Sequence, residues 1–279
     1  RYSDPLVDDK TLVIVISQSG ETLDTMAALR EAKARGGHIL SIVNVVGSSI
    51  ARESDDVLYT WAGPEIAVAT TKAYSTQLIL LDMLGLYFAD ALGTVGQSEY
   101  AAIIDEILRL PGKMEQMLEN IDDIKHFASK YFNHNSVFFI GRNLDYAMGL
   151  EGSLKLKEIS YIHSEAYASG ELKHGTISLI EDGTLVIALG TYAPLFDKAM
   201  SNVVEVQARG ADVLALTTEG HVTEMKKTVE NVMSVPETHK ILQPSLGVVP
   251  LQLFAYYVAL LRGCDIDKPR NLAKSVTVE

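Results

Sequence analysis

Cysteine is nearly absent from this sequence, because Cys264 is the single one among 279 residues. One thiol can form neither an intramolecular disulfide nor a cysteine metal cluster, so nothing calls for an oxidising compartment. We therefore expect a cytoplasmic protein in which Cys264 is a small buried hydrophobe.

Basic charge is also scarce. Lys and Arg number 24 against 36 Asp and Glu, which gives a net charge of -12. No stretch concentrates Lys and Arg as a duplex-binding face would, so we expect no nucleic-acid partner. The overall negative field repels an anionic substrate. Such a substrate would have to be held locally, by backbone dipoles and a few well-placed cations.

The chain lacks a long unbroken apolar run. The longest, residues 246–261, is interrupted by Pro250 and Gln252 and is short for a membrane span, so it predicts a buried helix. We expect no transmembrane segment, no signal segment and no membrane partner. The chain begins at Arg1 rather than Met, and we expect an upstream piece to be missing.

What the sequence does contain is an ordinary globular composition with several β-branched runs. At about 150 residues per domain, its length predicts two domains. The apolar run at 11–16 predicts a strand buried on both faces of a parallel sheet. A helical pattern and a second apolar run at 39–45 complete a βαβ unit. A short strand at 57–60 and helical stretches at 67–92 and 98–132 follow, the last interrupted at Pro111-Gly112.

The second half of the chain repeats the first. Residues 184–189 resemble 11–16, and 208–214 resemble 34–40. A duplicated βαβ architecture predicts an α/β fold with two doubly wound parallel-sheet domains, each an αβα sandwich. The second copy also has an earlier strand, at 136–140, without a counterpart in the first. We therefore expect the first domain to be truncated at its N-terminus.

Three hydroxyls and an amide follow the first predicted strand, in the loop Ser17-Gln18-Ser19-Gly20-Glu21-Thr22. In a doubly wound sheet, ligands lie beyond the carboxyl ends of the strands, where a helix N-terminus presents free N–H groups to an anion. The loop therefore suits a phosphate. The alternative is a plain helix cap by Ser19 and Thr22. The matching loop of the second copy, 190–194, lacks this cluster of hydroxyls, so we expect one site per chain.

Charged residues recur along the predicted helix at 149–159. Spacings of four and three place Glu151, Lys155 and Glu158 on one face. One interpretation is a surface ladder of ion pairs, which contributes little. The other is a buried polar strip in which Lys155 keeps Glu158 ionised as a general base.

Two further residues could carry chemistry. His174 lies beside Gly175 on a polar turn, where an imidazole can exchange protons near neutral pH, although a lone turn histidine is more often only a surface residue. Lys274 lies in the tail after the last helix and is either a solvated end residue or a lysine delivered into a pocket for Schiff-base chemistry with a carbonyl.

Taken together, these segments resemble a known family. The sequence is similar to the isomerase half of the glutamine:fructose-6-phosphate aminotransferases (glucosamine-6-phosphate synthases) over essentially the whole chain. The motifs that carry the resemblance are 17–22, 65–73, 158–163, 170–175 and 269–279. The resemblance implies two sugar isomerase (SIS) domains, over 1–110 and 111–279, paired in a homodimer.

The resemblance also implies a role for each site residue. The sugar phosphate would be held by residues of the first loop and of the segment after the third strand: Ser17, Gln18, Ser19, Thr22, Val68 and Thr70. Lys274 would form the Schiff base with the ketose carbonyl, with the backbone of Ala273 nearby. Glu158 would move the proton between C1 and C2, with Lys155 beside it. His174 would assist ring opening from the neighbouring subunit, and no metal or cofactor would be required.

The implied reaction converts fructose 6-phosphate and ammonia to glucosamine 6-phosphate in hexosamine biosynthesis. Nothing in the sequence corresponds to the glutaminase that supplies ammonia in this family, and the family's first strand is missing, so we expect weak or no turnover. Thr176 stands where relatives commonly have proline. The alternatives are another SIS enzyme, such as a deglycase, and a regulatory module that binds sugar phosphates without chemistry.

Overall fold

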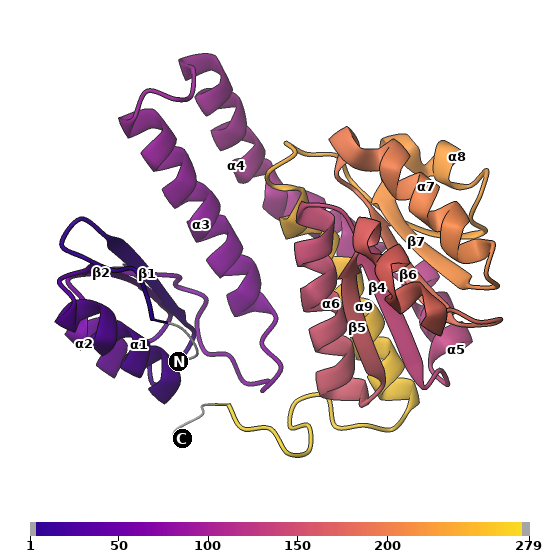
Figure 1. The fold of residues 1–279 in the computed structure, drawn as a ribbon, viewed down its shortest axis with the longest axis horizontal. Coiled ribbons are helices and arrows are strands. Elements are labelled where there is room, and N and C mark those ends of the chain that lie inside the picture. The colour runs from indigo at the N-terminus through magenta and orange to yellow at the C-terminus, as the bar shows by residue number, and fades with distance from the viewer. Residues whose placement is uncertain (1–3, 275–279) are drawn as a thin grey trace. The chain divides into compact units, whose positions relative to one another are not determined.

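The computed structural model describes residues 4–274, and the final part of the tail motif lies outside them (Figure 1). The chain divides into two compact units, residues 1–81 with 271–279 and residues 82–270. The tail residues 271–274 thus belong to the first unit. The SIS domain boundaries at 1–110 and 111–279 are a different division of the chain and stay a prediction.

The first unit contains a parallel sheet of order β1-β2-β3. Its elements are β1 (Leu12–Ser17), α1 (Leu23–Ala34), β2 (His38–Val43), α2 (Ser49–Glu53) and β3 (Asp56–Tyr59). Helix α3 (Lys72–Ala91) begins in this unit. Both short helices pack on one face of the sheet, where Leu29 and Ile50 meet Val15 and Val43 in a buried cluster.

The prediction that the first strand is buried on both faces is wrong. Leu12, Ile14 and Ile16 are 39–44% exposed, whereas Val15 is buried. The reason is position in the sheet. β1 is an edge strand of the described sheet, and the cluster formed with α1 and α2 covers only the face on which Val15 lies.

The second unit contains a five-stranded parallel sheet of order β5-β4-β6-β7-β8. Its strands are β4 (Ser136–Gly141), β5 (His163–Ala168), β6 (Leu185–Gly190), β7 (Asp212–Thr218) and β8 (Asn231–Val235). Its helices are α4 (Gln97–Glu119), α5 (Asp122–Tyr131), α6 (Leu144–Ser160), α7 (Phe196–Gln207), α8 (Val222–Met225) and α9 (Gln243–Leu261), with short 3₁₀ turns η1 (Ser169–His174), η2 (Thr176–Leu179), η3 (Ala193–Leu195) and η4 (Glu219–His221).

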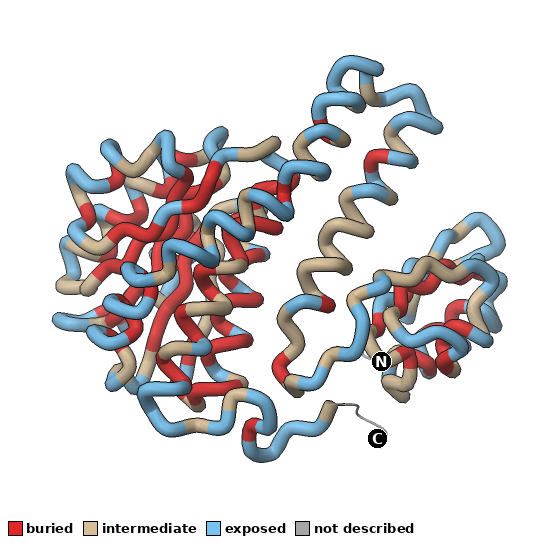
Figure 2. Tube along the Cα trace, turned by 180° about the vertical axis from the view of Figure 1, so that it is seen from behind, coloured by how far each residue is buried: buried red, intermediate tan, exposed pale blue. Residues whose placement is uncertain are grey.

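Helices cover both faces of this sheet, and its central strands are buried along their length (Figure 2). Phe138 and Ile140 of β4 pack on Phe196 and Val203 of α7. Phe139, between them, lies on the opposite face beneath α6, because a Cβ added at Gly152 of α6 would lie 3.0 Å from its ring. The αβα sandwich predicted for the second copy is confirmed.

The predicted repeat is confirmed by the order of the strands. β1-β2-β3 in one unit corresponds to β6-β7-β8 in the other, and β4 is the earlier strand expected at 136–140. Within the described residues, β6 has β4 on one side and β7 on the other, whereas β1 pairs with β2 alone.

Two predicted helix boundaries are wrong. The stretch at 98–132 is not interrupted at Pro111, because α4 passes through it and ends at Glu119. Pro111 and Gly112 are exposed, so water can satisfy the carbonyl that proline leaves without a donor. The helix expected from residue 67 begins only at Lys72, and the Glu65 carboxylate accepts a hydrogen bond from the Ala73 N–H in its first turn.

Helix α9 is long and apolar enough to cross a bilayer by length and composition, but more than half of its most apolar window is buried inside the protein. This burial confirms the buried helix predicted from 246–261. Cys264, which follows α9, is only partly buried, so its predicted full burial is wrong. It lies in the loop that leaves the helix, outside the packed layers.

Candidate active site

The loop between β1 and α1 is shaped by its own hydroxyls. The Gly20 N–H donates to Ser17 Oγ over 3.0 Å, and Ser17 Oγ lies 3.1 Å from Thr22 Oγ1. The Glu21 N–H donates to Ser19 Oγ. Thr22 is the N-cap residue of α1, yet its hydroxyl makes no capping hydrogen bond. The loop is thus organised as a turn around Ser17, at the carboxyl end of the strand.

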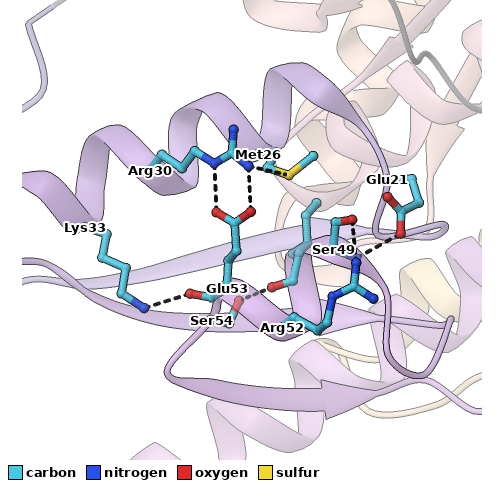
Figure 3. A network of polar contacts seen from close by, with 9 residues as sticks. Glu21, Met26, Arg30, Lys33, Ser49, Arg52, Glu53 and Ser54 are labelled. Atoms are coloured by element: carbon cyan, nitrogen blue, oxygen red, sulfur yellow. Dashed lines mark hydrogen bonds and ion pairs between the residues drawn. The ribbon is translucent and has the colours of Figure 1, made fainter.

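Glycine is required at position 20. Its φ of +68° is in the left-handed region, and an added Cβ would lie 2.0 Å from Ser48 Oγ. Glu21 fastens the same turn to α2, because its carboxylate accepts a hydrogen bond from the Ser49 N–H, which also lowers its pKa. Figure 3 shows Glu21 and Ser49 near the two-pronged ion pair between Arg30 of α1 and Glu53 of α2. The loop between β1 and α1 is therefore fixed both by its own hydrogen bonds and by its contact with α2.

Asn44, directly after β2, joins this loop to the next one. Its N–H donates to the Gln18 carbonyl over 3.1 Å. Its side-chain oxygen accepts hydrogen bonds from Thr60 and Ala62, and its amide nitrogen donates to the Gly63 carbonyl. Sequence reasoning missed Asn44, although its place at the carboxyl end of the neighbouring parallel strand was the available signal.

The tail lysine lies in the first unit, against the segment that follows β3. Lys274 Nζ donates to the Ala67 carbonyl over 2.6 Å and lies 3.2 Å from Thr70 Oγ1. The Thr70 hydroxyl donates in turn to the Val68 carbonyl. Ala273 immediately precedes this lysine. The structure thus brings the predicted residues at 68, 70, 273 and 274 together.

Lys274 and the first loop share a cavity of about 540 Å³. Its lining includes Gln18 and Ser19 from the loop, and also Asn44 and Glu65. Trp61, the single tryptophan of the chain, forms part of the wall and is 77% exposed. One cavity therefore presents hydroxyl, amide and ammonium groups, which suits a polar anion with a carbonyl to be attacked. Sequence reasoning also missed Trp61.

In the second unit, the charged residues of α6 form a buried strip. Lys155 Nζ lies 2.6 Å from Glu158 Oε2 and 3.6 Å from Glu151 Oε1. The side chain of Lys155 is only 6% exposed, so the strip is not a surface ladder. Burial raises the pKa of Glu151 to about 7, although the Lys155 ammonium opposes this shift. Lys155 therefore contacts one carboxylate that is mostly buried and one, Glu158, that is partly accessible.

His174 ends η1, on the other face of the same sheet. Its imidazole is 65% exposed, with Nε2 3.9 Å from Glu171 Oε2. Leu172 of η1 packs with Phe138 and Phe196 on the face that α7 covers. Helix α6, which carries Glu158, packs on the opposite face of this sheet.

Comparison with known proteins now identifies the architecture. The family model for the SIS domain matches residues 1–87 and 130–262. The chain belongs to the SIS domain family. The SIS fold predicted from the sequence is thereby confirmed, and the two matched segments fall on the two parallel sheets.

Several SIS relatives are similar over the whole chain. The glutamine–fructose-6-phosphate aminotransferase (isomerizing) of Clostridium tetani is 59% identical over 279 residues, which are 100% of this chain and 46% of the relative. The corresponding protein of Caldanaerobacter subterraneus is 58% identical over the same lengths. This chain therefore spans about half the length of the curated relatives it matches, and corresponds to their C-terminal half.

Two solved structures are also similar. The C-terminal domain of glucosamine-fructose-6-phosphate aminotransferase from Francisella tularensis has a TM-score of 0.91 and 37% identity, covering 96% of this chain and 76% of that one. Glucosamine-6-phosphate deaminase from Thermotoga maritima has a TM-score of 0.75 and 26% identity, covering 98% of this chain and 77% of that one. The predicted resemblance to the aminotransferase family is confirmed.

Proposed function

We propose that this chain is the sugar-phosphate isomerase part of an isomerizing aminotransferase, which forms glucosamine 6-phosphate from fructose 6-phosphate and ammonia. The observation that carries the proposal is Lys274, whose ammonium lies in the wall of the same cavity as Gln18 and Ser19. The printed names of the relatives support the substrate and the reaction.

The first unit would bind the sugar phosphate. The amides of Gln18 and Ser19 and the hydroxyls of Ser17, Ser19 and Thr22 lie at the carboxyl end of β1, where an oxyanion can be held without adding positive side chains. Val68 and Thr70 would line the sugar from the segment against which Lys274 rests. The net charge of -12 repels an anionic substrate, and these local donors would hold the phosphate in spite of that repulsion.

Lys274 would then attack the C2 carbonyl of the opened sugar. Its unprotonated amine adds to C2 and water leaves, which gives an imine that accepts electrons better than the ketone. Ammonia replaces the lysine at C2 and frees the Lys274 amine. Glu158 removes a proton from C1 and returns it to C2, so that C1 becomes the aldehyde carbon and C2 carries the amine. Lys155, 2.6 Å away, forms an ion pair with this carboxylate and holds it in place.

Ring opening by His174 would require a second copy of the chain. Within the second unit, η1 packs on one face of the sheet through Leu172, and α6, which carries Glu158, packs on the other. This separation favours a second chain as the source of the histidine. His174 is exposed and free to enter a neighbouring site. We therefore propose a homodimer in which each site takes its histidine from the partner.

The proposed chemistry needs no metal or redox cofactor, because the lysine imine supplies the electron sink. In the relatives, whose names include glutamine, we propose that the ammonia comes from a separate glutaminase part. A cytoplasmic location fits a single unpaired cysteine.

Borohydride trapping tests the proposal. The chain is incubated with fructose 6-phosphate and borohydride, and the masses of its peptides are measured by mass spectrometry. We expect a reduced sugar adduct on Lys274, which is lost in Lys274→Arg and kept in Lys268→Arg, a matched change at an exposed lysine of the same tail. Binding of the sugar phosphate without an adduct at Lys274 would instead support a regulatory module without chemistry. Formation of glucosamine 6-phosphate from added ammonia separates the proposed enzyme from a deglycase.

A further inference from the structure

Asp145 is a buried carboxylate that the proposed mechanism does not use. It is the second residue of α6 and is 2% exposed. Its partners do not belong to its own helix. The Thr191 N–H lies 3.1 Å from Oδ2 and 3.3 Å from Oδ1, the Tyr192 N–H donates to Oδ2 over 3.1 Å, and the Thr191 hydroxyl donates to Oδ1 over 2.5 Å.

The two amides that hold Asp145 correspond to those of the predicted phosphate loop. Thr191 and Tyr192 are the first two residues after β6, as Gln18 and Ser19 are the first two after β1. The strands are equivalent, because β6 pairs with β7 as β1 pairs with β2, residue by residue up to the last residue of β6 and of β1. One kind of loop therefore occurs twice in the chain, and in the second unit it grips an oxyanion with consecutive backbone N–H groups.

Local structure delivers the carboxylate to this loop. β4 lies beside β6, so the turn after β4 reaches the end of β6. Gly141, the last residue of β4, leaves room for the first turn of α6, because a Cβ there would lie 2.5 Å from the Asp145 carbonyl carbon. Among the described residues, no strand lies in the equivalent position beside β1, and no carboxylate contacts the amides of Gln18 and Ser19.

We propose that Asp145 is a built-in anion that occupies the second unit's counterpart of the phosphate loop and closes it to sugar phosphates, which leaves each chain with one phosphate site. The assignment of that site to the first unit rests on the proposed function. The occupation of the second loop by Asp145 does not.

The charge state of Asp145 follows from its partners. Burial raises its pKa, and the three donors oppose that shift. Both amides can only donate, and they meet both carboxylate oxygens, which is the arrangement that an ionised carboxylate satisfies. A bound phosphate or formate would meet the same donors.

Removal of the carboxylate should open the loop to added anions. We would measure thermal unfolding and isothermal calorimetry of Asp145→Ala with inorganic phosphate and with formate. We expect the variant to be destabilised without these anions, to regain stability with them and to bind two phosphates per chain where the wild type binds one. Asp145→Asn keeps the volume of the side chain, so an uncharged amide still fills the loop. We expect phosphate and formate to leave the thermal stability of this variant unchanged.

Asp197→Ala is the matched control, because it removes an exposed aspartate from the first turn of α7 and changes the net charge equally. An equal response to phosphate and formate in Asp145→Ala and Asp197→Ala would overturn the proposal. Where Asp145→Ala does not fold, Asp145→Ser takes its place in the same comparison. Failure of the proposed function alone would look different: the wild type would bind no phosphate, while Asp145→Ala would bind one.

Discussion

Lys155 Nζ lies 2.6 Å from Glu158 Oε2, and the lysine side chain is almost fully buried. The two residues are three positions apart on α6, so the helix itself fixes the ion pair. A carboxylate that is held in place by a neighbouring ammonium can serve as a general base, which accepts a proton from carbon. This geometry supports the proposal that Glu158 is the general base and that Lys155 is its charge partner.

Replacement of Glu158 tests this role directly. Glu158→Gln keeps the size and the hydrogen-bonding capacity of the side chain but cannot accept a proton from C1. In a preparation that turns over fructose 6-phosphate and ammonia, we expect exchange of the C1 hydrogen with solvent to fall by about 10²–10⁴-fold, with sugar binding nearly unchanged. Proton NMR in deuterated water measures the exchange. Glu224→Gln, at an exposed carboxylate, should exchange as the wild type, and retained exchange in Glu158→Gln would exclude it as the base.

The third member of the buried strip predicts a pH dependence of stability. Burial raises the pKa of Glu151 to about 7 in the folded protein, above its ordinary value near 4.5. The folded state therefore holds this proton more tightly than the unfolded state. Its contribution to the free energy of unfolding is fully present below pH 4.5 and is lost as pH rises through 7.

Glu151→Gln removes this titration and keeps the shape. We expect the difference in unfolding free energy between variant and wild type to change by about 1–3 kcal/mol between pH 5 and pH 8, in favour of the variant at the higher pH. Urea denaturation at each pH measures it. Asp82, whose pKa burial raises to about 6, titrates in both proteins and cancels in the difference. A difference that is constant with pH would mean that Glu151 is ionised throughout.

Trp61 offers a direct report of sugar binding in the first unit. It is the single tryptophan of the chain and lies in the wall of the cavity that Gln18, Ser19 and Lys274 also line. We expect fructose 6-phosphate to shift or quench its emission, and fructose without phosphate to have no effect at the same concentration. Trp61→Phe should abolish the signal while calorimetry still detects binding.

The hydroxyls of the loop should set the affinity that this signal measures. Ser19→Ala with Thr22→Ala removes two donors to a charged ligand, each of which contributes about 1.5–3 kcal/mol. We expect the dissociation constant of fructose 6-phosphate to rise at least about tenfold. Ser201→Ala, which deletes an exposed hydroxyl bonded to its own helix, is the matched control. An unchanged dissociation constant would show that this loop does not bind the phosphate.

Sequence reasoning could predict the elements and the chemistry-bearing residues because both depend on local patterns. β-branched runs marked β1 and β6, and the spacing of Glu151, Lys155 and Glu158 placed them on one helical face. Spacing could not decide whether that face is buried, because burial depends on the elements packed against it. For the same reason, the exposed face of β1 and the clamp at Asn44 depend on which strands and loops are neighbours in space.

The contact between Asp145 and Thr191 shows the same limit across a longer separation. The residues are 46 positions apart, and the pairing of β4 with β6 brings them together. The sequence predicts no phosphate site at 190–194 because this loop lacks the hydroxyl cluster of 17–22. The structure adds a physical reason, because its amides already hold a carboxylate.

The proposed dimer predicts complementation between two inactive chains. His174→Ala and Lys274→Ala each remove one group from every site of their own homodimers. If each site combines Lys274 of one chain with His174 of the other, a mixed dimer contains one intact site. Random mixing of equal amounts should restore about a quarter of wild-type activity. Assays of fructose 6-phosphate turnover before and after mixing under exchange conditions measure it, and no recovery would count against a histidine donated by the partner.

The turn that leads into α6 is strained, and relief of the strain should stabilise the protein. Asn143 has φ 53° and ψ -121°, a region that glycine alone enters readily, and its side chain is exposed and makes no capping hydrogen bond. In a residue other than glycine, such a conformation costs about 1–3 kcal/mol. Glycine avoids this strain but loses about 0.5–1 kcal/mol more backbone entropy on folding. We therefore expect Asn143→Gly to raise the free energy of unfolding by about 1 kcal/mol. Asn143→Ala removes the same side chain without relieving φ and should not stabilise. Equal effects of both changes in urea denaturation would show that the side chain, rather than the backbone, carries the cost.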